Sequence, residues 1–337
     1  MDPSAAFTWV DGERVIRYGA GEVRMADALL EGRAFRPYAL LTTDRATAAA
    51  PFIVEDADVV VHVPSGPVPE AAAAVRADVG GRSLVALGGG RVIDAAKAIG
   101  AVDGLDVAAI PTTLSGAEYT RFHRPPAGVG SYTPVRPSLV IADPDLMASQ
   151  PMPGLAASAL NAMAHAVESL YTPLTNPAAQ LCALQAIELI GAALGEAEPD
   201  RPRLALGAVL AGWAAGSARY AFIHVLCQTT VRVAGTPHAQ TYAVILPHGL
   251  RLLEPRVPEL LTCIAARLGA EDPTPQLAAA RVAHLGAQAH VVRLSALGVS
   301  EDDIAEIVSQ AAARAELQNM PDPPDAAELE VLLRAAL

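Results

Sequence analysis

Short runs of β-branched and other apolar residues alternate with alanine-rich stretches through the first part of the chain. The runs predict strands at 14–18, 38–43, 59–63, 84–87, 107–110 and 139–142, most of them followed by Gly, Pro, Asp or Ser. The stretches between them, such as 69–79 and 92–100, predict helices. Strands joined by crossover helices form a parallel sheet, so this part is expected to be an α/β domain with a Rossmann-like sheet.

From Met152 onward the β-rich runs mostly vanish, and apolar positions recur at helical spacing. Prolines at 173, 177, 199, 202 and 237 are expected to interrupt the helices. Pro151 and Pro153 mark the change, because each lacks a backbone donor and restrains the residue before it. We therefore expect an α/β domain over 1–150 and an all-α domain over 151–337.

Composition agrees with two ordinary domains. The 337 residues are 52% hydrophobic and 18% charged, which is enough apolar material for two cores. The net charge is −12 and no run of Lys or Arg offers a positive face, so nucleic acid is not an expected partner. No stretch approaches eighteen uninterrupted apolar residues and the chain does not open like a signal peptide, which predicts a cytoplasmic protein without a membrane partner.

Cysteines are too few and too scattered for a structural framework. Cys182, Cys227 and Cys263 are odd in number and far apart. This argues against a disulfide network and against a thiolate metal cage. We interpret them as small buried apolar residues in a reducing compartment.

Three consecutive glycines, Gly88, Gly89 and Gly90, separate a buried strand from an amphipathic helix in SLVALGGGRVIDAAKAIG. Glycines let a backbone approach a pyrophosphate closely, and the helix start supplies N–H groups and the positive end of the dipole. The spacing differs from GxGxxG, and a plain tight turn would use the same residues. The segment is a candidate dinucleotide-phosphate loop.

An acidic residue follows an earlier predicted strand. Asp44 in YALLTTDRA stands where such folds bind a ribose hydroxyl, and a carboxylate there favours NAD over NADP. Its neighbour Arg45 weakens that preference. A helix-capping or turn role for Asp44 is an equal alternative.

Four segments, in order, resemble those of iron-type alcohol dehydrogenases. GGGRVIDAAKAIG is similar to their GGGSxxDxAKAI loop, and IPTTLSGAEYT to their PTTxGTGSExT segment. NAMAHAVESLY from Asn161 and TPHAQTYAVILPHG from Thr236 complete the set. The closer resemblance is to maleylacetate reductases, which share the opening VRVxxGAG, here ERVIRYGAG, and the helix NAxAHAVEALY.

The resemblance implies the dehydroquinate synthase-like fold of these enzymes, an NAD or NADP coenzyme and a homodimer formed through the first strands. Coenzyme contacts are implied for Asp44, Gly88, Gly89, Gly90, Arg91, Asp94, Thr112, Thr113 and Leu114. The segment that carries the last three faces the nicotinamide in the family.

A metal is not expected, although three histidines are candidates to bind one. Asn161 and His165 are spaced i to i+4 on one helix face, and His224 and His238 are expected to converge on it. Metal-dependent relatives carry Asp in place of Asn161, whereas maleylacetate reductases carry Asn and are regarded as metal-independent. Without the carboxylate the site loses its only anionic ligand and some affinity.

The chain departs from maleylacetate reductases where those enzymes read HHKLCHTLGG. Here the segment is IHVLCQTTVR, so Val225 replaces a Lys, Gln228 a catalytic His, and Val231 and Arg232 a pair of glycines. The amide of Gln228 cannot exchange a proton at neutral pH. In the nucleotide loop Arg91 replaces a Ser, where its guanidinium either adds donors to the pyrophosphate or obstructs the loop.

Substrate contacts are predicted from the segment after the nicotinamide motif. Tyr119, Arg121 and His123 are candidates, and Arg121, His123 and Arg124 either bind a carboxylate or face solvent. These residues begin a stretch, RFHRPPAGVGSYTP, that replaces a longer hairpin in the relatives.

Two classes of function follow. In the first, a nicotinamide coenzyme delivers hydride to a carbonyl or enone of a small anionic substrate, and His165, His224 or His238 polarises its oxygen, with Asn161, Gln228 and His248 nearby. In the second, the losses at Val225, Gln228 and Arg91 mark a non-redox enzyme such as a dehydratase, isomerase or cyclase, with the histidines as acid and base. A catalytically silent partner subunit is a third alternative.

Overall fold

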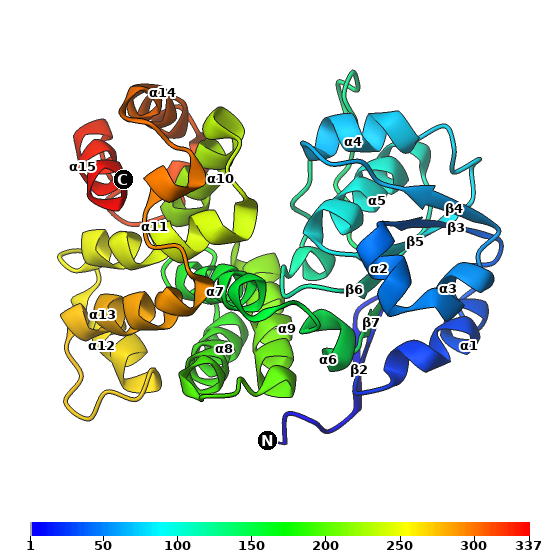
Figure 1. Cartoon of the computed structure of the whole chain (residues 1–337), viewed down its shortest axis with the longest axis horizontal. Coiled ribbons are helices and arrows are strands. Elements are labelled where there is room, and N and C mark those ends of the chain that lie inside the picture. Colours follow the sequence, from blue (N-terminus) through cyan, green and yellow to red (C-terminus); the bar gives the residue numbers. More distant parts are fainter. Residues whose placement is uncertain (1) are drawn as a thin grey trace. The chain divides into compact units, whose positions relative to one another are not determined.

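The computed structural model describes residues 2–337, which belong to two compact units, 1–149 and 150–337. Figure 1 shows that strands are confined to the first unit and that the second is built from helices. The predicted fold class, an α/β domain followed by an all-α domain, is confirmed.

A seven-stranded sheet in the order β1-β2-β7-β6-β5-β3-β4 forms the centre of the first unit. Every neighbouring pair is parallel except β1 with β2. The strands are β1 (Phe7–Asp11), β2 (Arg14–Tyr18), β3 (Tyr38–Thr42), β4 (Val59–His62), β5 (Ser83–Gly88), β6 (Val107–Pro111) and β7 (Leu139–Ala142). All six predicted strands are present within a residue or two of their expected ends.

Strand β1 was not predicted. It pairs with β2 as a hairpin, with Val10 opposite Val15 and Asp11 opposite Arg14, and Gly12 turns the chain with φ of 63°. Its residues alternate between half-buried and exposed, so it lacks the continuous apolar run of the inner strands. The Asp-Gly dipeptide at the turn is the signal that would have revealed it.

The sheet is covered on both faces. Leu84 and Ala86 of β5 belong to one core cluster with α4 (Val68–Val75) and α5 (Gly90–Asp103), whereas Val85 and Leu87 belong to the opposite cluster. That second cluster includes residues of α1 (Ala26–Glu31), α2 (Asp44–Ala49) and α3 (Pro51–Glu55). Because successive strand residues point to opposite faces, burial of both faces explains why β5 is apolar throughout.

Nine α-helices make up most of the second unit. They are α7 (Met152–Ser169), α8 (Pro177–Gly195), α9 (Arg201–Ala218), α10 (Phe222–Ala234), α11 (His238–Leu253), α12 (Pro258–Arg267), α13 (Pro275–Gly286), α14 (Glu301–Ala312) and α15 (Ala326–Ala336). Pro177 and Pro202 lie in the first turns of α8 and α9, where the missing N–H costs nothing, but Pro247 lies inside α11. Helix α7 is buried at most of its positions and contacts α8, α9 and α11.

In residues 2–337, α8 is the one helix long and apolar enough to cross a membrane by length and composition. Buried residues make up 39% of its apolar window. A core helix of a soluble protein meets the same criterion. The absence of a membrane partner stays a prediction.

Candidate active site

The chain reverses its path across the sheet between β3 and β5. From β3 it continues to β4 at one edge, and from β5 it continues the other way through β6 to β7. Loops that leave the carboxyl ends of two such strands diverge, and open α/β sheets bind ligands in that crevice. The loops at this point carry Asp44 and the three glycines, so the topology brings two predicted coenzyme segments to neighbouring strands.

The glycine loop fits a pyrophosphate. Gly89 is the N-cap of α5 and has no side chain to satisfy the first N–H groups of the helix. A Cβ on Gly88 would lie 2.7 Å from Val92 Cβ, and one on Gly89 would lie 3.0 Å from Thr113 Cγ2. The loop is therefore packed too closely for side chains, and its uncapped helix start has the positive dipole end that binds anions.

Asp44 is exposed and does not cap its helix. Thr43 is the N-cap of α2 and accepts from Ala46 N, whereas Asp44 follows it with a side chain that is 96% exposed. Its carboxylate pairs with Nδ1 of His62 at 2.8 Å. Thr43 therefore fills the helix-capping role that was an alternative for Asp44. The Asp44 carboxylate faces solvent at the carboxyl end of β3.

The predicted nicotinamide segment is tied to the loop. Thr112 N donates to Gly88 O at 2.9 Å, and Arg45 Nη2 donates to both Thr112 O and Thr112 Oγ1 at 3.0 Å. Leu114 is fully buried, so its side chain serves the core. Arg91 is exposed on the first turn of α5. Coenzyme binding by these residues stays a prediction.

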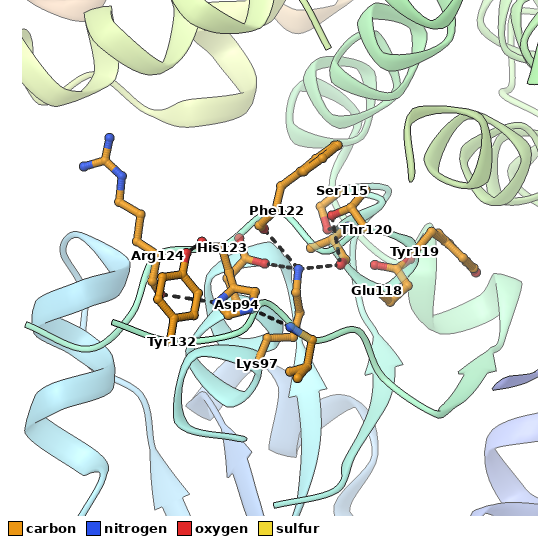
Figure 2. A network of polar contacts seen from close by, with 12 residues as sticks. Asp94, Lys97, Ser115, Glu118, Tyr119, Thr120, Phe122, His123, Arg124 and Tyr132 are labelled. Carbon is orange, nitrogen blue, oxygen red and sulfur yellow. Dashed lines mark hydrogen bonds and ion pairs between the residues drawn. The ribbon is translucent and has the colours of Figure 1, made fainter. Parts of the chain in front are cut away.

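A buried lysine connects α5 to the segment after β6 (Figure 2). Lys97 is fully buried, and its Nζ donates to Asp94 Oδ1 at 2.7 Å, Ala117 O at 2.9 Å and Phe122 O at 3.1 Å. All three ammonium protons are thereby satisfied. Asp94, predicted as a coenzyme contact, therefore orients the lysine that fixes this segment to the nucleotide loop's helix.

Glu118 lies beside this lysine without a hydrogen bond to its carboxyl group. Its side chain is fully buried, and among residues 2–337 neither carboxyl oxygen has a partner. Burial raises its pKa from 4.5 to about 7, although the charges of Lys97 and Arg14 lower it. A carboxyl group in this position is therefore largely protonated below neutral pH.

Glu118 makes the first unit less stable as pH rises. The carboxyl group binds its proton more tightly in the folded state, so its contribution is fully present below pH 4.5 and is lost as pH rises to about 7. The Glu118→Gln variant lacks this loss. Relative to wild type, it is expected to gain about 3 kcal/mol of unfolding free energy between pH 4.5 and pH 8.

Urea unfolding at the two pH values measures this difference. Glu70→Gln is the control, because Glu70 is exposed on α4 and should follow the wild-type profile. A Glu118→Gln profile parallel to wild type would show that the buried carboxyl group does not titrate in this range.

The predicted substrate residues of this unit lie in different environments. His123 Nε2 accepts from Val135 N at 3.1 Å, and Tyr132 Oη donates to His123 O, so the ring holds the loop together. Burial lowers the pKa of His123 to about 4, which leaves it neutral. Tyr119 is buried, whereas Arg121 is exposed. Of the three, only Arg121 presents a charge to solvent at neutral pH, and their substrate role stays a prediction.

In the second unit, one face of α7 meets the start of α10. Glu168 is fully buried and accepts from Ile223 N at 2.7 Å and from His224 N at 3.3 Å, the first N–H groups of α10. Tyr171 Oη donates to this same oxygen, Oε1, at 3.2 Å, and the other oxygen, Oε2, contacts Nδ1 of His224. Several donors converge on one carboxylate, which both caps α10 and orients the histidine.

His224 stands between Glu168 and His165. Its Nε2 lies 3.3 Å from Nε2 of His165, and the two ring centroids are 4.1 Å apart. Burial lowers the pKa of His224 well below its ordinary value, and burial raises that of Glu168 against the pull of its backbone donors. We assign a neutral His224 with its proton on Nδ1, facing the carboxylate. Its Nε2 then accepts from His165, which gives a carboxylate–imidazole–imidazole relay.

Aromatic rings complete the cluster. The Tyr242 ring contacts His224 edge-on at 4.8 Å and His238 at 4.9 Å. The structure thus brings together His165, His224 and His238, with Asn161 buried one turn before His165 on α7. His238 is exposed at the start of α11, and His165 is half-buried.

His248 is not part of this cluster in its recorded contacts. It follows His238 by ten residues on α11, almost three helical turns, and its ring contacts Nη1 of Arg251 at 3.3 Å. Burial, reinforced by Arg251, lowers the pKa of His248 to about 4. Its predicted catalytic role stays untested.

The expectation that no metal is bound stays a prediction. Among residues 2–337, no three or more His, Cys, Asp or Glu side chains are grouped to hold one. The amide of Asn161 is neutral, so an ion bound by the three histidines would lack an anionic ligand, and the contact of His224 Nδ1 with Glu168 leaves Nε2 as its ligand atom. The two facing Nε2 atoms are at hydrogen-bonding distance.

Gln228 lies one turn after His224 on α10 and contacts an arginine that the sequence analysis did not single out. Arg314 Nη1 donates to Gln228 Oε1 at 2.9 Å, and Arg314 Nη2 donates to Tyr220 Oη at 3.1 Å. The Tyr220 ring lies 5.5 Å from that of His224. A cation therefore stands next to the histidine cluster, where Val225 provides none.

Comparison with known proteins identifies the family. Residues 155–337 match the model of the Fe-containing alcohol dehydrogenase family, C-terminal domain. The chain belongs to this family. Maleylacetate reductase of Sphingobium indicum is 35% identical over 318 residues, which cover 89% of each chain. Maleylacetate reductase 2 of Cupriavidus pinatubonensis is 37% identical over 224 residues, 64% of this chain and 62% of that one.

A solved structure agrees over the full length. The crystal structure of maleylacetate reductase from Agrobacterium tumefaciens has a TM-score of 0.82 at 28% identity and covers 99% of this chain and 98% of that chain. The predicted resemblance to iron-type alcohol dehydrogenases and maleylacetate reductases is confirmed. The protein is an enzyme of this oxidoreductase family, whose members use NAD(P) and often a divalent metal.

Sequence reasoning missed Glu168 although a signal was present. Asn161, His165 and Glu168 are spaced i, i+4 and i+7, so the same helical face that joined the first two also holds the third. Arg314 had no such signal, because its contact with Gln228 spans 86 positions of the chain.

Proposed function

We propose that this enzyme is an NADH-preferring, metal-independent reductase of a small carboxylate-bearing enone or ketone such as maleylacetate. The Glu168–His224–His165 relay in the second unit is the observation that carries the proposal, because it orients an acid–base pair. The nucleotide loop of the first unit keeps the close packing that a pyrophosphate needs.

When bound, a nicotinamide coenzyme would supply the hydride for the new C–H bond, and an electron pair of the substrate's reduced double bond would move onto its oxygen. The protein's groups manage that charge. The exposed His238 donates a hydrogen bond or proton to the oxygen. His165 does so in its doubly protonated form, in which Nε2–H stays with His224 and the Nδ1 proton is the one donated; solvent restores the proton. His224 stays behind them, held by Glu168, and fixes the orientation of His165.

NADH preference rests on Asp44. Its exposed carboxylate at the end of β3 suits two ribose hydroxyls and repels the additional phosphate of NADPH. Metal independence rests on Asn161, a neutral amide where metal-dependent relatives carry Asp. A cytoplasmic homodimer formed through the first strands remains part of the proposal.

Steady-state assays with maleylacetate test this function. The purified enzyme should oxidise NADH in its presence, should use NADPH less efficiently, and should keep its rate after dialysis against a chelator. Elemental analysis should find far less than one metal ion per chain. Absence of binding to both coenzymes would reject the reductase, and a rate that depends on restored metal would reject metal independence.

A further inference from the structure

We propose that Arg314 and Gln228 form the subsite that binds a carboxylate of the substrate. The inference rests on the proposed reduction of an anionic substrate and assigns its recognition to two residues. Gln228 follows His224 by four residues, so both side chains lie on one face of α10. The guanidinium of Arg314 contacts that same face through Gln228.

Arg314 is held rigidly on this face. It precedes a short 3₁₀ turn, Ala315–Gln318, that follows α14. Glu316 Oε1 accepts from Arg314 Nη2 at 3.0 Å and from Tyr220 Oη at 3.1 Å, and Asn319 Nδ2 donates to Tyr220 O at 3.1 Å. A planar fork fixed in advance loses little entropy when it binds a planar carboxylate.

Unused donors remain on both residues. Arg314 has five N–H groups, of which Nε and Nη2 face Glu316 and Tyr220 and one on Nη1 faces Gln228. The second Nη1 proton has no partner recorded in residues 2–337. Gln228 accepts through Oε1, so its two N–H donors, on Nε2, lie in the plane of the same amide group beside that oxygen. Two neighbouring N–H donors, one of them cationic, match the two oxygens of a carboxylate.

Charge and burial favour an anion here. The Arg314 side chain is only 13% exposed, so an ion pair with it is screened less than one at the open surface. Glu316 offsets part of the charge, but its side chain is 39% exposed, so water can take the place of Arg314 as its hydrogen-bond partner. The positive charge also reaches the cluster, since Arg314 contributes to the lowered pKa of His224. Gln228 thus replaces an acid–base residue with a neutral donor that works with the arginine.

Arg314→Gln provides the test. With maleylacetate, kcat/KM is expected to fall about 100-fold, mostly through KM, because a charge-assisted hydrogen bond is lost. With the uncharged dimethyl ester of the same compound, kcat/KM should change less than about threefold. Equal losses with both compounds would overturn the proposal, since a merely structural role affects both alike.

Two further variants guard against misfolding as an explanation. Glu316→Gln removes the competing negative charge and keeps an acceptor, so it should lower KM for maleylacetate. Arg256→Gln is the matched control, because Arg256 is 8% exposed and paired to Glu328 in the same unit. It should reduce stability without changing the preference for the acid over the ester. An unchanged or raised KM in Glu316→Gln would contradict the subsite.

A binding measurement separates this inference from the proposed function. Succinate offers two carboxylates and no reducible bond, and it should raise the Tm of the wild-type and Arg256→Gln proteins but not of Arg314→Gln. If succinate stabilises in this pattern and NADH is not oxidised, the reductase fails while the subsite stands. If NADH is oxidised and Arg314→Gln keeps the succinate shift, the subsite is rejected alone.

Discussion

Glu168→Gln is expected to lower kcat with NADH and maleylacetate about 100-fold. The carboxylate keeps the His224 proton on Nδ1 and leaves Nε2 to accept from His165. An amide can present its N–H to Nδ1 instead, which reverses the tautomer and breaks the relay. Glu168→Ala should in addition lower the unfolding free energy by about 3–5 kcal/mol, because it leaves the N–H groups of Ile223 and His224 without their acceptor.

Tyr171→Phe is the control for this pair. It removes one donor to Glu168 Oε1 and leaves the carboxylate and both histidines in place. Its kcat should stay within a few-fold of wild type in the same assay, and urea unfolding should show a loss of about 1 kcal/mol. Full activity in Glu168→Gln would mean that the relay has no part in the chemistry.

Gly89→Asp is expected to weaken NADH binding on the order of 100-fold, because like charges placed together cost several kcal/mol. The new carboxylate would stand at the uncapped start of α5, where the pyrophosphate is proposed to bind. Its Cβ would also press on Thr113 Cγ2, 3.0 Å away. NADH fluorescence titration measures the change in Kd.

Gly104→Asp supplies the matched control at the opposite end of the same helix. Gly104 is the C-cap of α5 with φ of 68°, a conformation that Asp tolerates better than most residues, and no atom lies within 4 Å of an added Cβ. It should alter stability slightly and leave Kd unchanged. Arg91→Ala tests the neighbour, since weaker binding would show that its guanidinium adds donors and tighter binding that it obstructs. Equal Kd values for the two aspartate variants would remove the loop from the coenzyme site.

The positions of the inner strands along the chain were predictable, because burial on both faces gives β3, β5, β6 and β7 long apolar runs. Strand β1 was not predicted, because an edge strand with one exposed face has only a weak alternation of apolar and polar residues. Pro247, which was not considered in the prediction from sequence, lies inside α11, where burial of the neighbouring turns outweighs the lost hydrogen bond.

Helical spacing made part of the site predictable, and the family motifs supplied His224 and His238. Asn161 and His165 share a face of α7, and Gln228 follows His224 by one turn of α10. The convergence of α7 and α10 through Glu168, and the contact of Arg314 with Gln228, join residues 56 and 86 positions apart. Such contacts depend on packing in three dimensions and leave no periodic pattern in the chain.

The most direct test of the central claim uses NADH that carries deuterium at both C4 positions. If this enzyme transfers hydride to maleylacetate, mass spectrometry should find the product one mass unit heavier than that formed with ordinary NADH, in one-to-one proportion with NADH consumed. Conversion of the substrate without deuterium in the product, or without loss of NADH, would contradict hydride transfer and favour the non-redox chemistry that the Gln228 and Val225 replacements first suggested.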